Sequence, residues 1–164
     1  MAADGASAWL LAVEQSGIGN SIRQSIWFYP AANVAHVLGL ALFAGALVVM
    51  DLRLLGAFAA TRPADVILPA RRFAIGALTL MLLSGSGLFI AEASHISQNP
   101  VFLTKISLVT LGILLALLTH RPLSRYLQEA VPFEPIPFAF KFTAGLSLAL
   151  WLTVAGLGRF IAYL

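Results

Sequence analysis

The 164-residue sequence is 60% hydrophobic and only 10% charged, whereas roughly a quarter of the residues of a soluble domain carry charge. This composition excludes an ordinary soluble fold and predicts a single integral membrane domain whose main partner is the lipid bilayer. The net charge of +3 gives no reason to expect nucleic acid, and the lack of cysteine excludes disulfides, thiolate metal sites and iron–sulfur clusters.

Residues 1–26 are predicted to form an N-terminal segment at the membrane surface. Trp9, Leu10 and Val13 fall near one face of a short helix over residues 6–15, which suits the interface because it is too short to cross a bilayer. A partly ordered tail is the alternative. The glycine-rich stretch that follows is expected to end this helix. The segment lacks the basic start and long apolar core of a signal peptide, so we expect it to be retained.

Four apolar runs predict four membrane-spanning helices within residues 27–164. The first run, residues 27–52, starts with a tryptophan, a phenylalanine and a tyrosine, rings of the kind that settle at lipid headgroups. It carries no charged residue from Pro30 to Met50, a stretch long enough to cross about 30 Å of hydrocarbon. It is therefore predicted to be a transmembrane helix.

The remaining spans are predicted at residues 72–92, 101–120 and 138–161. Between the spans we expect a connector at 57–70, a polar turn around 92–100 and a proline-rich loop at 121–136. Because short connections make consecutive helices antiparallel neighbours, the predicted fold class is all-α. It is an integral membrane four-helix bundle with a short N-terminal interfacial helix.

The lysines and arginines predict the orientation of the bundle. Seven lie on the side of the 57–70 and 121–136 connections: Arg53, Arg62, Arg71, Arg72, Arg121, Arg125 and Lys141. The other side holds three: Arg23, Lys105 and Arg159. Since cytoplasmic loops carry the excess of positive charge, both termini and the 92–100 turn are predicted to lie outside the cytoplasm.

Small residues recur about one helical turn apart in two of the spans. The fourth span has Gly145, Ala149, Thr153 and Gly156, and the second has serines and glycines at residues 84–87. In lipid such seams let helix backbones approach closely. They are equally compatible with space for a flat cofactor.

Polar residues from all four spans are expected to meet in one layer near the outer boundary. Its predicted members are Asn33, His36, Glu92, His95, Lys105 and Arg159. An ionisable residue inside a spanning helix is costly, and it marks a functional site by default. This layer is therefore the candidate site, with His36 at its centre.

Each member also has an ordinary structural interpretation. In that interpretation His36 hydrogen-bonds a neighbouring helix, and Lys105 and Arg159 extend to the headgroups. His95 lies in a polar turn and can be solvated. His120, at the opposite end of the third span, fits a cytoplasmic interfacial position.

A b-type haem requires an axial imidazole, a narrow apolar slot and cations near its propionates. His36 is the predicted axial ligand, and Lys105 and Arg159 are the predicted cations. His95 is the most natural second axial ligand, and without it the iron is five-coordinate or takes Lys105. Asn33 is a candidate acceptor for the second imidazole nitrogen of His36. The slot is expected from Gly39, Phe43, Ser84 and Gly87.

A bare metal site is the alternative to haem. In it, His36 and His95 are the metal ligands, together with Glu92, and copper or zinc is the ion that such a set would hold. Nucleophilic triads and phosphate-binding loops are absent from the sequence.

The motifs WFYPAANVAHVLGLALFAGALVVMDLRLLG, NPVFLTKISL and WLTVAGLGRFIAY resemble an uncharacterised family of four-helix bacterial inner-membrane proteins. More distantly, the chain is similar to copper-resistance D-type membrane domains and to four-helix haem-binding protoporphyrinogen oxidases. Those oxidases pair a histidine of the first span with a lysine of the third, and His36 and Lys105 match this pair. The tryptophan-rich context of the oxidases is not evident here, so the resemblance does not imply their activity.

The predicted protein is thus a multi-pass protein of the bacterial inner membrane with both termini periplasmic. The leading functional hypothesis is haem b binding in the periplasmic half of the bundle, with electron transfer to a periplasmic redox protein. The alternatives are a membrane subunit for copper or other metal handling, which would meet a metal-carrying protein, and a non-catalytic scaffold subunit. A homo-oligomer is compatible with the small-residue seams.

Overall fold

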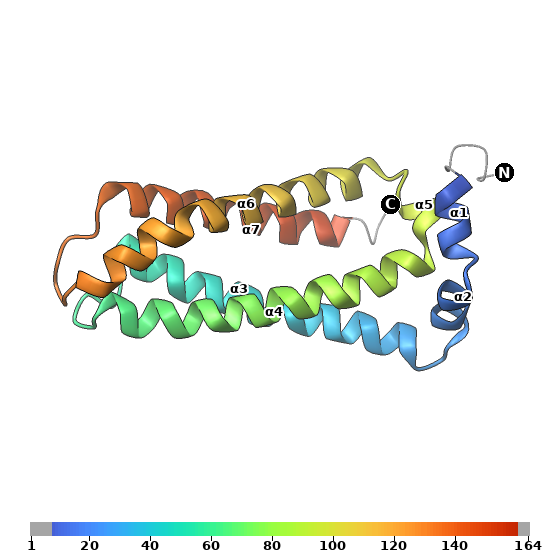
Figure 1. Cartoon of the computed structure of the whole chain (residues 1–164), viewed down its shortest axis with the longest axis horizontal. Coiled ribbons are helices and arrows are strands. Elements are labelled where there is room, and N and C mark those ends of the chain that lie inside the picture. The colour runs from blue at the N-terminus through green and yellow to red at the C-terminus, as the bar shows by residue number, and fades with distance from the viewer. Residues whose placement is uncertain (1–7, 161–164) are drawn as a thin grey trace.

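A computed structural model describes residues 8–160 of the chain, which form helices and their connections without a β-strand. The helices are α1 (Ala8–Glu14), α2 (Gly17–Gln24), α3 (Phe28–Leu55), α4 (Pro63–Ala91), α5 (Ala93–Ile96), α6 (Pro100–Glu129) and α7 (Phe138–Phe160). The helices α3, α4, α6 and α7 are long and apolar enough to cross a membrane. The predicted all-α, multi-pass membrane architecture is confirmed (Figure 1).

The N-terminal segment contains two short helices rather than the single one predicted. The predicted break after residue 15 is a tight turn in which Ser16 caps α2, because the Gly19 N–H donates to the Ser16 hydroxyl at 3.1 Å. Gly19 also gives the two helices room to meet, since a side chain there would overlap the backbone of Glu14. Residues 6 and 7 of the predicted interfacial helix lie outside the described residues.

Helices α4 and α6 extend well beyond the predicted spans. α4 starts at Pro63 rather than residue 72, and α6 continues to Glu129 rather than ending near residue 120. Proline fits the first helical position because its missing N–H has no partner there in any case. A change from apolar to charged residues marks where a helix leaves the lipid, not where it ends. The predicted connections at 57–70 and 121–136 are therefore shorter in the folded chain.

The four long helices form two antiparallel pairs. α3 packs along most of its length on α4, α6 packs on α7, and α7 joins the pairs by packing on α3. Figure 1 shows α1, α2 and α5 at one end of the bundle and both interhelical connections, α3 to α4 and α6 to α7, at the other. We call these the outer end and the basic end.

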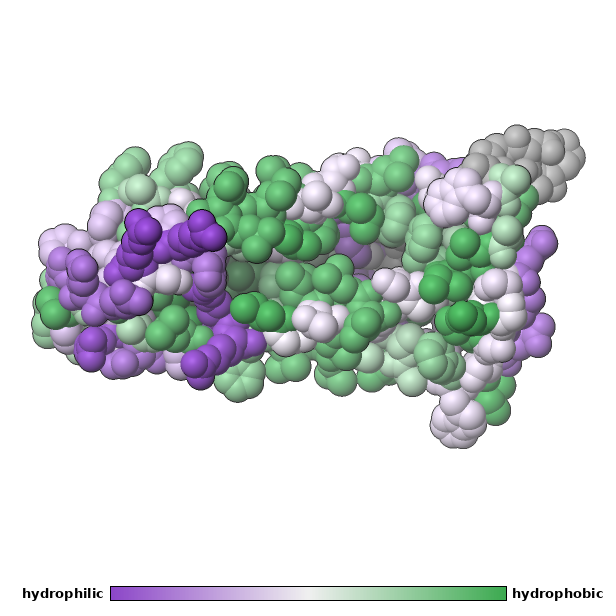
Figure 2. All heavy atoms as spheres, in the orientation of Figure 1, coloured by the Kyte–Doolittle hydropathy of each residue, from purple (hydrophilic) through white to green (hydrophobic). Residues whose placement is uncertain are grey.

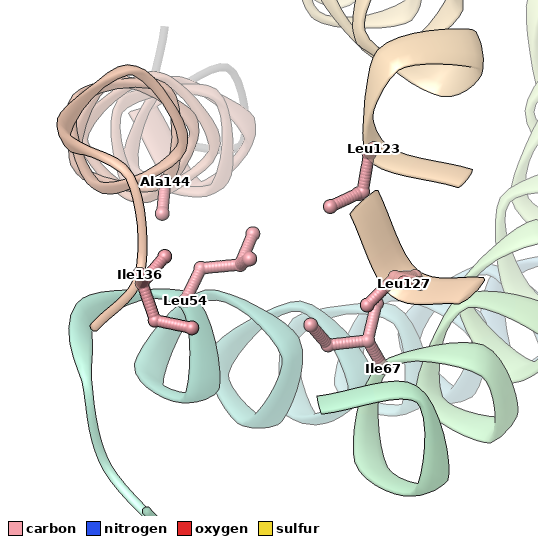
Figure 3. Packing of buried hydrophobic residues seen from close by; sticks show 6 residues of the cluster. All are labelled: Leu54, Ile67, Leu123, Leu127, Ile136 and Ala144. Carbon is pink, nitrogen blue, oxygen red and sulfur yellow. The ribbon is translucent and has the colours of Figure 1, made fainter. Parts of the chain in front are cut away.

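A buried apolar cluster holds the two pairs together at the basic end. It takes residues from all four long helices and from the connection before α7: Leu54, Ile67, Leu123, Leu127, Ile136 and Ala144 (Figure 3). On the face seen in Figure 2, hydrophilic residues gather over the same end, whereas hydrophobic residues cover the middle of the molecule. This distribution matches a bundle whose middle lies in lipid.

Helices α4 and α6 touch mainly near their ends. At the outer end the rings of Phe89 and Phe102 stack, with centroids 5.6 Å apart. At the basic end Arg71 of α4 donates to the hydroxyl of Ser124 on α6 at 3.4 Å. Between these contacts the pairs lie apart, and Figure 2 shows the surface hollowed there.

Candidate functional site

His36 lies on the inward face of α3 and turns its ring toward α4. Gly39, Phe43 and Leu47 follow it on the same face and are buried. The His36 Nδ1 atom is 3.1 Å from the carbonyl oxygen of Met81. The ring therefore faces the neighbouring helix and not the lipid.

The two partners of Nδ1 determine where the imidazole proton lies. A carbonyl oxygen can only accept, so the Nδ1–H of His36 must donate to Met81. The same nitrogen is 3.1 Å from the hydroxyl of Ser84, which donates its own hydrogen to the carbonyl of Leu80 at 2.7 Å. With Nδ1 protonated, a neutral ring carries its lone pair on Nε2.

A glycine lets the imidazole lie against the α4 backbone. A Cβ atom at Gly85 would lie 3.0 Å from Cε1 and 3.3 Å from Nδ1 of His36, closer than ordinary van der Waals contact. The glycine thus fixes how near the ring approaches α4. One member of the small-residue stretch of the second span, Gly85, therefore allows the His36 ring to pack on α4.

Lys105 reaches the same region from the third span. Its side chain is half-buried and lies over Gly158 of α7, where an added Cβ would be 3.3 Å from Nζ. The ammonium group is close enough to the His36 ring for the two to interact electrostatically. Within residues 8–160 it has no hydrogen bond or salt bridge. The structure thus brings together the histidine and the lysine that the sequence singled out.

The other predicted members of the layer lie elsewhere. Asn33 is exposed and makes no hydrogen bond in the described chain, so its predicted role as the partner of His36 is wrong. The two side chains are neighbours along α3, but the His36 ring turns to α4 and Asn33 stays on the exposed side of α3. Arg159 is exposed next to Gly158, and it makes an interaction of its own.

His95 and Glu92 sit at the outer end of the bundle. Glu92 accepts a hydrogen bond from the Tyr29 hydroxyl at 2.8 Å, and His95 is exposed on α5. His36 lies seven residues further along α3 than Tyr29, which is roughly 10 Å deeper in a helix. The structure therefore does not bring His95 over the His36 ring.

The expected slot between α3 and α4 is filled. A Cβ at Gly39 would lie 2.8 Å from Cγ of Met81, and Phe43 belongs to the buried seam between the two helices. Here the small residues serve close packing, which was the other interpretation of the pattern.

The bare metal site also lacks its ligands. Across the part of the chain that the structure describes, no three His, Asp or Glu side chains are gathered so that they could hold one ion. His36, Glu92 and His95 consequently do not form the ligand set required by the copper alternative.

A cavity in the basic half of the bundle was not predicted from the sequence. It has a volume of about 250 Å³, and all four long helices line it. Asp51 is 2% exposed at its wall, and Oδ2 of this side chain has no hydrogen-bond partner within residues 8–160. The only signal in the sequence was the position of Asp51, directly after the uncharged run that ends at Met50. It did not reveal which way the side chain turns.

A family model described as "Family of unknown function (DUF6644)" matches residues 17–164. No curated protein and no solved structure matches the chain. The similarity to copper-resistance domains and to haem-binding oxidases therefore stays an expectation from the sequence motifs.

Proposed function

The chain belongs to this family of unknown function, and we propose that it binds haem b in the outer half of the bundle and acts in electron transfer. His36 is the axial ligand. The observation that supports this most is the bonding of the His36 ring, whose Nδ1 is held by Met81 and Ser84 while Nε2 carries the lone pair.

The bonding pattern is the one that metal-bound histidines use. Their second ring nitrogen donates to a carbonyl or carboxylate, which fixes the tautomer and the ring orientation. A haem needs only one such side chain from the protein, since the porphyrin supplies the remaining equatorial ligands. The lack of a three-residue metal cluster in the described chain therefore bears on the copper alternative and not on haem.

Lys105 and Arg159 are the cations available to the haem. Lys105 lies within electrostatic range of His36 and has no other charged partner in the described residues, so it suits a propionate or the sixth position at iron. Arg159 follows Gly158, on which the Lys105 ammonium rests. The resemblance to the four-helix oxidases, which use a histidine and a lysine from the same two spans, supports this pairing.

Haem bound here would supply a one-electron redox centre. The charge distribution supports a periplasmic outer end, because seven of the ten lysines and arginines lie toward the basic end. The redox partner is then a periplasmic protein that meets the bundle at its outer end. The proposed membrane is the bacterial inner membrane, as the family resemblance implies.

The test is the absorption spectrum of protein purified after expression with added haem precursor. We expect a Soret band in the wild type and its loss in His36→Ala. The matched control is His120→Ala. It removes an exposed histidine from the basic half of α6 and should keep the band.

Two outcomes would contradict the proposal. One is a wild-type protein without a Soret band under these conditions, and the other is a band of equal intensity in His36→Ala. Metal retained without haem would favour the copper alternative. If His36→Ala changes neither haem binding nor metal binding, a scaffold subunit would be favoured.

A further inference from the structure

The cavity in the basic half has mostly apolar walls with polar groups at two opposite sides. Phe43 and Trp151 form an edge-to-face aromatic pair at the cavity, with ring centroids 4.6 Å apart. Gly112 of α6 makes room for this indole, since a Cβ there would lie 2.7 Å from the Trp151 ring. The aromatic wall is thus built from three helices.

One polar side lies where α3 meets α7. It carries Asp51, whose carboxyl is almost fully buried and has one oxygen without a partner in the described chain. The Ser147 hydroxyl of α7 interacts with the same carboxyl. Leaving a buried carboxyl oxygen unpaired is costly, and such groups persist where a ligand uses them.

The other polar side lies where α4 meets α6. Arg71 donates from one guanidinium nitrogen to the ring of His120 and from another to Ser124. Because arginine can only donate, a ring nitrogen of His120 is the acceptor. This group joins two helices that otherwise touch little.

The size, charge and access of the cavity restrict its ligand. At about 250 Å³ it is smaller than the ~300–1,000 Å³ of sites for drug-sized molecules, so it takes a small ring system. Its walls are mostly apolar and its guanidinium already donates to Ser124 and His120, so an uncharged ligand fits better than an ion, whose desolvation is costly. Its rim residues Ile75 and Leu117 are 59% and 66% exposed, which opens it to lipid between α4 and α6.

We propose that this cavity binds the ring head group of a membrane quinone that enters from the lipid. The head group is flat, uncharged and apolar, and it has a hydrogen-bonding oxygen at each end of the ring. Quinone oxygens only accept hydrogen bonds, so the Ser147 hydroxyl and the carboxyl of Asp51, which is protonated because it is buried without a cation partner, face one oxygen as donors. The side with Arg71 and His120 faces the other. The inference goes beyond the proposed haem function and does not depend on it.

Trp151 makes the binding measurable. The chain has three tryptophans, so replacing Trp9 and Trp27 by phenylalanine leaves the cavity indole as the only one. We expect a short-chain benzoquinone to quench Trp151 emission along a saturating curve in detergent-solubilised protein. In this background, Asp51→Leu should raise the apparent Kd at least about tenfold, which corresponds to ~1.4 kcal/mol. Asp65→Asn, which alters an exposed carboxylate of α4, should leave the Kd unchanged.

The controls separate binding from misfolding and from haem. Asp51→Leu removes an unpaired buried carboxyl, so its thermal transition should lie at or above that of the parent. His36→Ala should keep the quenching in full, so loss of haem and loss of quinone binding are distinguishable. Quenching that rises linearly without saturation would overturn the proposal. An unchanged Kd in Asp51→Leu would also overturn it. So would saturable quenching of Trp151 by an alkylamine that the quinone does not displace.

Discussion

The position of His36 depends on a single glycine of the facing helix. Gly85→Ala would place a methyl group 3.0 Å from Cε1 of His36, so the ring must shift by a few tenths of an ångström. We expect a displaced or weakened Soret band with little change in helix content. Gly76→Ala on the same helix is the matched control, because its added methyl group meets nothing within 4 Å. Identical absorption spectra for the two variants would show that Gly85 does not determine the position of the His36 ring.

The sequence identified His36 and Lys105 because ionisable residues inside a spanning helix are conspicuous against lipid-soluble neighbours. It did not identify the acceptor of the His36 proton. That acceptor is mainly the backbone carbonyl of Met81, which no pattern of side chains reveals. Asp51 was missed for a related reason, since the sequence places it near a span end but does not say that it is buried there.

At the scale of helices, the contact of α1 with α5 depends on one carboxylate. The Ser94 hydroxyl and backbone N–H, together with Arg23, hold the pKa of Glu14 below its ordinary value. The Ser94 N–H donates to Glu14 Oε2 at 2.9 Å, and the Arg23 guanidinium lies 3.0 Å from Oε1. Since the lowered pKa belongs to the docked state, docking is fully stabilised above the ordinary glutamate pKa of ~4.3 and weakens as the pH falls through the lowered value.

Hydrogen exchange at the Ser94 amide reports this docking. Its protection factor should be constant from neutral pH down to about pH 5 and fall below about pH 4. In Glu14→Gln the protection should already be reduced at neutral pH, because the charged acceptor is gone. Glu129→Gln, at the far end of α6, should have no effect. Unchanged Ser94 protection in Glu14→Gln would show that another contact holds α1.

Helix identity was predictable and helix length was not. Hydropathy located all four spans because the bilayer requires about twenty apolar residues in each. It began the second span too late and ended the third too early. α4 is already helical from Pro63, before Arg71 and Arg72, and α6 stays helical through Pro122 to Glu129. Water at the basic end satisfies polar side chains without ending a helix.

At the scale of the whole molecule, the proposed periplasmic site depends on the orientation of the bundle. The chain has no cysteine, so a single introduced cysteine can be located with a membrane-impermeant maleimide. Gln98→Cys at the outer end should be labelled in spheroplasts, whereas Gln128→Cys at the basic end should react only after the membrane is disrupted. Both glutamines are exposed, which makes them a matched pair. The reverse pattern would place the haem site toward the cytoplasm.

The arrangement of the two helix pairs separates the two proposed sites. Apolar packing at the basic end and the α3 to α7 contact join the pairs, and the gap between α4 and α6 leaves room inside. His36 and Lys105 occupy the outer half, and Asp51 with its cavity occupies the basic half. The antiparallel topology was predictable from short connections, whereas this uneven spacing of the pairs was not.

Chemical rescue tests the central claim, that the imidazole of His36 binds iron, most directly. His36→Gly removes the ring and leaves space for a free imidazole beside Gly85. We expect the purified variant to lack the Soret band of the wild type, and to regain it when haem and imidazole are supplied together but not with haem alone. A His36→Gly protein that keeps the wild-type spectrum without imidazole would contradict the account.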